Sequence, residues 1–157
     1  MGEGQAQKVS RAALTRRRDP DASHEAWLIH YGDVLVGTVA VRTGVPSEAD
    51  QWSWRVGFHP ASGRGLRASG IAKSFDAARA AFDTAWQFLL PKFTEADFRE
   101  YRQHRAMDTW KHQMWAEGCK LPTQVADGRS TCFCGVEITI ADVEKHVYVA
   151  HMEAILK

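Results

Sequence analysis

The chain has 157 residues, 45% hydrophobic and 25% charged, which is the mix of a globular protein rather than a disordered one. Its formal net charge of +1 excludes a strong overall field toward nucleic acid or an anionic membrane. No apolar run approaches the ~20 residues needed to cross a bilayer, and the first twenty residues lack the apolar stretch of a secretory signal. Three cysteines, an odd number, fit a reducing compartment better than a disulfide framework, so we expect a cytoplasmic protein.

The first part of the chain is basic and poor in large apolar side chains. Residues 1–18 contain one anion, Glu3, and five cations, namely Lys8, Arg11, Arg16, Arg17 and Arg18. Chain ends of this composition are commonly mobile. The sequence therefore predicts a flexible basic arm over residues 1–24. The alternative is a solvated tail without a binding role.

Residues 26–72 show the pattern of an antiparallel sheet. Runs rich in β-branched and aromatic residues cover 27–31 and 34–42, and the short break at Gly32-Asp33 suits a hairpin. Residues 51–58 alternate, with Trp54 and Val56 on one face and Arg55 on the other. Residues 71–72 add a short final strand. The pattern predicts three or four strands with an aromatic core.

Two helices follow the predicted sheet. Ser74 is a helix cap, and apolar residues recur at three- and four-residue spacing as far as Leu89, before Pro91 ends the helix. Thr94 caps a second, longer helix that Gly118 terminates. The apolar positions of this second helix are sparser, so we expect one of its sides to face water. Its histidines, His104 and His112, are interpreted as surface residues.

Residues 131–152 contain a set of metal-ligand residue types. Cys132 and Cys134 form a C-x-C pair followed by Gly135, and His146 and His151 form an H-x4-H pair on a predicted helix. Two thiolates and two imidazoles are the ligands of a structural zinc site. The segment resembles a ββα zinc finger of the two-cysteine, two-histidine class, which implies one Zn²⁺ held by these four residues.

The C-x-C pair departs from that class, whose knuckle has two or more residues between its cysteines. Cys119 is therefore an alternative ligand, and an ordinary core cysteine pair is the alternative to any metal site. The helix after the knuckle carries Lys145 and Lys157 beside three acidic residues, which is a poor surface for reading DNA. We interpret the site as a folding staple or a protein-contact module.

The sheet and first helix carry two further resemblances. The Trp52-x-Trp54 strand and the Gly70-x-Ala72-x-Ser74 turn into an Ala-rich helix resemble a group of small alphaproteobacterial proteins over residues 26–124, a group with no function to transfer. The order of three strands and one helix also resembles the DNA-binding domain of plant ethylene-response factors. That second resemblance implies that the sheet contacts nucleic acid.

Nucleic acid is one of two candidate partners. The candidate contact residues are arginines of the arm, the sheet and its loops, namely Arg16, Arg17, Arg18, Arg42, Arg55, Arg64 and Arg67. Their alternative interpretation is a solvated face. Another protein is the second candidate partner, in which case the chain is a zinc-stabilised interaction module. We expect no membrane partner, and no small-molecule substrate is identified.

No pattern of catalytic residues stands out, because the sequence holds no Ser-His-Asp order or paired carboxylates, and no base lies beside Cys119. The sequence favours a non-enzymatic protein without deciding the question. It predicts an α+β fold in three parts: the arm (1–24), a domain of a sheet with two helices (25–124) and a ββα zinc-finger-like unit (125–157).

Overall fold

The computed structural model describes residues 13–157, and the chain divides into two units, one ending at Phe98 and the other running from Arg99 to Lys157. Residues 1–12 of the predicted basic arm lie outside the described residues. No helix in the described part of the chain combines the length and apolarity that a membrane-spanning helix needs.

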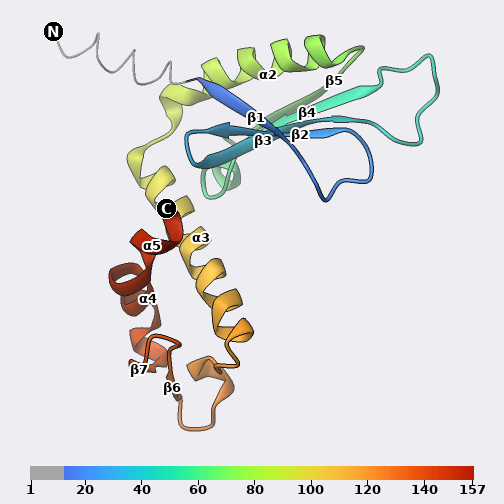
Figure 1. Ribbon diagram of the computed structural model, residues 1–157. Coiled ribbons are helices and arrows are strands. Elements are labelled where there is room, and N and C mark those ends of the chain that lie inside the picture. Colours follow the sequence, from blue (N-terminus) through green and yellow to red (C-terminus); the bar gives the residue numbers. More distant parts are fainter. Residues whose placement is uncertain (1–12) are drawn as a thin grey trace, which may run out of the picture. The chain divides into compact units, whose positions relative to one another are not determined.

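The first unit is built on an antiparallel sheet of five strands, paired in chain order (Figure 1). The strands are β1 (Leu14–Arg18), β2 (Ala26–Tyr31), β3 (Val34–Val41), β4 (Trp52–Val56) and β5 (Ala68–Ala72). The predicted count of three or four strands was therefore wrong. The additional strand, β1, lies where the sequence predicted a flexible arm, and it pairs with β2 from Leu14↔Tyr31 to Arg18↔Trp27.

Helix α2 (Phe75–Leu89) packs along one face of this sheet (Figure 1). The predicted cap is confirmed, because the Ser74 hydroxyl accepts a hydrogen bond from the Ala77 N–H at 3.1 Å. The helix also buries the predicted apolar stripe. Gly37 of β3 allows α2 to pack close to the sheet, since a Cβ at this position would lie 2.6 Å from the Phe82 ring.

Aromatic rings pack in the core of the first unit, beside buried valines and alanines that the predicted aromatic core did not include. Tyr31 packs on Trp86 with ring centroids 5.2 Å apart. Phe58 contacts Phe93 at 4.8 Å and stacks on Phe98 at 5.1 Å. Such ring pairs contribute about 1 kcal/mol each beyond the burial of their area. They tie the segment that follows α2 to the sheet, which is why the first unit extends to Phe98.

The second unit consists of most of a long helix, a short hairpin and a C-terminal helical segment. Its elements are α3 (Glu95–Ala116), a 3-10 turn (Pro122–Gln124), β6 (Arg129–Thr131), β7 (Glu137–Thr139), a second 3-10 turn (Ile140–Asp142), α4 (Val143–His146), a π-helical turn (Val147–His151) and α5 (Met152–Leu156). As predicted, α3 ends at a glycine in the left-handed region, because Gly118 has a φ of +72°.

The core of the second unit joins α3 to the hairpin and the C-terminal helix. Trp110 and Met114 of α3 are fully buried against Cys132, Ile138 and Val147. A segment of about thirty residues buries too little apolar surface to be stable alone, so it recruits the apolar side of α3. The predicted domain boundary between residues 124 and 125 falls inside this unit, which begins 26 residues earlier, at Arg99.

Candidate functional site

The structure brings the four predicted metal ligands together in the second unit. One possible ligand atom from each of Cys132, Cys134, His146 and His151 lies within 4.8 Å of the other three. The cysteines come from the turn between β6 and β7, and the histidines come from the helical segment that follows. The predicted α+β fold thus includes a Cys2His2 cluster, in which four ligands converge from two different elements.

The distances between these atoms fit one ion at their centre. A tetrahedral zinc with bonds of about 2.3 Å to sulfur and about 2.0 Å to nitrogen requires S···N edges of about 3.5 Å and an N···N edge of about 3.3 Å. The observed S···N distances are 3.4 Å for Cys132–His151 and 3.5 Å for Cys134–His146. The two Nε2 atoms are 3.1 Å apart. The cluster is therefore compatible with zinc binding.

A tight turn brings the two cysteines together despite the single residue between them. Gly135 has a φ of +95°, in the left-handed region that glycine tolerates best, and its N–H donates to the Cys132 carbonyl at 2.8 Å. The Cys132 N–H in turn donates to the Val136 carbonyl at 2.8 Å. The backbone closes the C-x-C turn with hydrogen bonds at both ends, so the short spacing does not prevent convergence.

A π-helical turn brings the two histidines together. In a regular α-helix, five residues advance by about 500°, which would leave His151 about 140° away from His146 around the axis. The turn over Val147–His151 has π-helical hydrogen bonding, which lengthens the local turn and returns His151 to the same side. The irregularity therefore lies where the H-x4-H spacing requires it.

Side chains around the cluster orient two of its ligands. The Trp110 indole N–H donates to the Cys132 sulfur at 3.3 Å, and the Phe133 ring lies 4.9 Å from the His151 ring. Burial raises the pKa of the Cys132 thiol, whereas burial, with a smaller contribution from the neighbouring His146, lowers the pKa of His151. A lower pKa favours the neutral imidazole, which is the form that binds a metal.

Trp110 is a contributor that the sequence interpretation missed. Ala106, Trp110 and Met114 recur at four-residue intervals in α3, and this apolar stripe could have identified them as packing partners of the C-terminal segment. Cys119, the alternative ligand, is half-buried and lies outside the four-residue cluster. Four protein ligands complete a tetrahedral shell, as in structural rather than catalytic zinc sites.

Four of the seven candidate arginines are engaged in contacts within the sheet unit. Arg16 and Arg18 lie over the Trp27 ring, at 4.9 and 5.6 Å. Arg42 donates to the Asp50 carbonyl at 2.8 Å.

Arg64, the fourth of these arginines, forms a bidentate ion pair with Asp97, at 2.7 and 3.0 Å. These four contacts stabilise the fold of the unit, so the four side chains are poorer candidates for binding nucleic acid.

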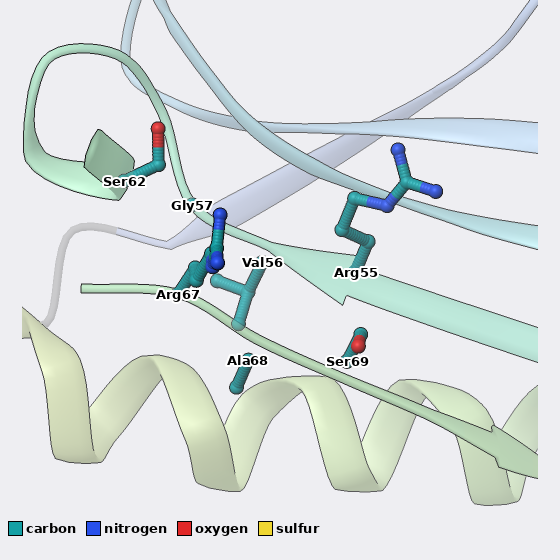
Figure 2. Close-up of a pocket in the computed structure, with 7 residues that line it drawn as sticks. All are labelled: Arg55, Val56, Gly57, Ser62, Arg67, Ala68 and Ser69. Carbon is teal, nitrogen blue, oxygen red and sulfur yellow. The ribbon is translucent and has the colours of Figure 1, made fainter. Parts of the chain in front are cut away.

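The other three arginines share the sheet face opposite α2. Arg17 and Arg55 lie in one cross-strand row, which passes through Leu28 and Thr38. Figure 2 shows Arg55 and Arg67 projecting from the strands away from α2. All three are exposed, and within residues 13–157 the structure gives none of them an ion pair. They form the exposed cationic part of this face.

Comparison of the chain with protein-family models, with curated proteins and with solved structures found no match in any of the three. Function must therefore be inferred from the metal-ligand cluster and from the arginine-bearing face of the sheet.

Proposed function

We propose that the protein binds one structural zinc ion in its C-terminal unit and binds nucleic acid through the sheet face opposite α2. The zinc assignment rests on the ligand-atom distances, which match a tetrahedral shell of two thiolates and two imidazoles. Soft thiolate and imidazole donors favour zinc over magnesium or calcium, which prefer oxygen. The hairpin followed by a helix supports the likeness to a two-cysteine, two-histidine finger.

The nucleic-acid assignment rests on three arginines, Arg17, Arg55 and Arg67, which lie on one exposed face and have no ion pair within the described residues. Arginine binds phosphate through a planar fork of donors. The strands contribute no Phe, Tyr or Trp to this face within residues 14–72, because their aromatic side chains pack on the α2 side. Binding therefore relies on backbone phosphates rather than on base stacking, and little preference for base sequence follows.

The finger-like unit supplies stability in this proposal rather than DNA recognition. Its C-terminal helical segment carries Lys145 and Lys157 against Asp142, Glu144 and Glu153, so its charge is slightly acidic. A major-groove reader needs a cationic surface. Zinc binding instead fixes the hairpin, the C-terminal helix and the adjoining part of α3 as one folded unit.

The function is tested by titrating the intact, zinc-loaded protein with fluorescently labelled single-stranded DNA, duplex DNA and RNA at low salt. We expect association that depends little on sequence and weakens with added salt, with a log–log slope between about −2 and −3 for two or three phosphate contacts. No association with any of these ligands at about 20 mM salt, with zinc still bound, would rule out this function.

A specific observation favours the second candidate function, an interaction module for another protein. Trp115 is 84% exposed on α3 and borders a cavity of about 440 Å³ lined also by Gly118, Cys119, Lys120 and Gln124. Exposed tryptophans are enriched among residues that dominate the energetics of protein interfaces. This alternative is tested if nucleic acid does not bind. A protein that co-purifies with the wild type should be lost from a Trp115→Ala variant. The control variant Phe88→Ala, which removes another exposed aromatic side chain, should retain it.

A further inference from the structure

A polar hollow of about 620 Å³ opens on the sheet face opposite α2, beside the end of β4 and the start of β5. Four of its lining residues carry hydrogen-bond donors in their side chains, namely Arg55, Ser62, Arg67 and Ser69. Figure 2 shows the side chains of Arg55, Arg67 and Ser62 on the side of the strands away from α2, whereas Val56 and Ala68 point toward the helix.

We propose that this hollow binds a phosphate group of the nucleic-acid backbone; the inference rests on the proposed function for the source of the phosphate. The lining carries two guanidinium charges and no carboxylate. Within residues 13–157 the structure gives neither Arg55 nor Arg67 an ion pair, and it gives the Ser62 and Ser69 hydroxyls no hydrogen-bond partner. Two cations and two hydroxyl donors without internal partners match the oxygens of a phosphodiester.

The backbone around the hollow fixes the positions of the residues that carry these donors. Arg55 and Ser69 are directly paired across β4 and β5. Ser62 lies in a 3-10 turn (Ala61–Arg64), and the same turn carries Arg64, whose bidentate pair with the buried Asp97 anchors it. With the backbone already ordered, ligand binding costs only the conformational entropy of the side chains.

Gly57 keeps the hollow open between its two arginines. A Cβ at this position would lie 3.1 Å from the Arg67 Cβ, and the φ of +143° is one that other residues rarely adopt. Its N–H is already used, because it donates to the Val36 carbonyl at 2.8 Å. Gly57 thus provides space rather than a contact, and the phosphate would be held by side chains.

The position of Arg17 favours a polyanion over a small free anion as the ligand. Arg17 lies in the same cross-strand row as Arg55, three strands away. Three strand spacings of about 4.8 Å place their backbones about 14 Å apart. One inorganic phosphate in the hollow cannot reach that far, but a nucleic-acid strand carries a charge about every 3.4 Å along a helix and can contact both.

The test compares the full-length, zinc-loaded wild type with Arg55→Gln, Arg67→Gln and the double variant. Arg105→Gln on α3 is the matched control, since it removes the same charge from an exposed arginine of the other unit. Because both arginines hold the same phosphate, the double variant should lose one phosphate contact and bind oligonucleotide about eight-fold more weakly at 0.1 M salt, and each single variant should fall between it and the wild type. The double variant should also flatten the salt slope by about 1, whereas Arg105→Gln changes neither quantity.

A second measurement separates this inference from the proposed function. Inorganic phosphate titrated into the ¹⁵N-labelled protein should shift the amide signals of Ser62 and Ser69 in the wild type but not in the double variant. Oligonucleotide binding that the double variant retains at full strength overturns the inference and leaves the proposed function standing. If no oligonucleotide binds, the proposed function fails and nucleic acid is refuted as the source; specific phosphate shifts would then still support the hollow as a phosphate site.

Discussion

Replacing Asp97 by asparagine should remove a buried ionic cap from the sheet unit. The Asp97 side chain is only 4% exposed and receives two hydrogen bonds from Arg64, at 2.7 and 3.0 Å. It also accepts from the Thr94 N–H at 2.8 Å, while its own N–H donates to the Thr94 hydroxyl at 3.2 Å. This reciprocal capping box starts α3, and the same carboxylate holds the 3-10 turn beside the proposed phosphate hollow.

The size of the effect follows from the pKa of Asp97. The hydrogen bonds from Arg64, opposed by burial, lower this pKa from 3.8 to about 2. A shift of that size corresponds to about 2 kcal/mol of unfolding free energy. Because the pKa is lowered in the folded state, this stability is fully present above pH 4 and is lost as the pH falls toward about 2. Asp97→Asn should therefore destabilise the unit at pH 7 but differ less from the wild type at pH 2.

Urea denaturation followed by tryptophan fluorescence measures this difference, since Trp27, Trp52, Trp54 and Trp86 all lie in the first unit. Asp83→Asn is the matched control. Its ion pair with Arg79 is a surface i,i+4 pair with a carboxylate 49% exposed, so its loss should change stability by less than about 0.5 kcal/mol. Equal effects of the two substitutions at pH 7, or an Asp97→Asn effect independent of pH, would refute the reasoning.

Three further predictions concern the metal unit. Removing zinc with a chelator should unfold the C-terminal half of α3 together with the hairpin, because Trp110 belongs to their shared core; hydrogen-exchange mass spectrometry should show residues 106–116 losing protection. Trp110→Phe removes the N–H donor to Cys132 and should lower zinc affinity about ten-fold in a chelator competition, whereas Trp86→Phe should leave it unchanged. Gly135→Ala places a side chain at a φ of +95° and should destabilise the zinc-loaded unit by about 1 kcal/mol in urea, while Gly63→Ala should not; equal midpoints would contradict this account of the turn.

The apolar periodicity predicted much of the first unit. Alternation in residues 51–58 and the stripe of residues 75–89 led to β4 and α2, because both elements bury one side against the other. Strand β1 was missed for a physical reason. Its residues Leu14–Arg18 include three arginines in succession, and an edge strand with stacked cations carries no hydrophobic alternation to detect.

The metal cluster was predicted from residue types alone, but its geometry was not. The spacing of His146 and His151 does not fit a regular α-helix, which would separate them, but it does not show that a π-helical turn brings them together. The hollow at Arg55 could not be predicted from the sequence either, because Ser62 and Ser69 come from a loop and a strand that only the fold brings together. Long-range proximity of this kind leaves no local pattern.

The central claim, one structural zinc held by four ligands, is tested most directly by counting metal in the purified protein. Native mass spectrometry with elemental analysis should find one zinc per chain in the wild type and in Cys119→Ser, whose thiol lies outside the cluster. The metal should be lost from a Cys132→Ser, His151→Ala double variant. A wild-type protein without zinc, or a double variant that retains its full content, would contradict the account.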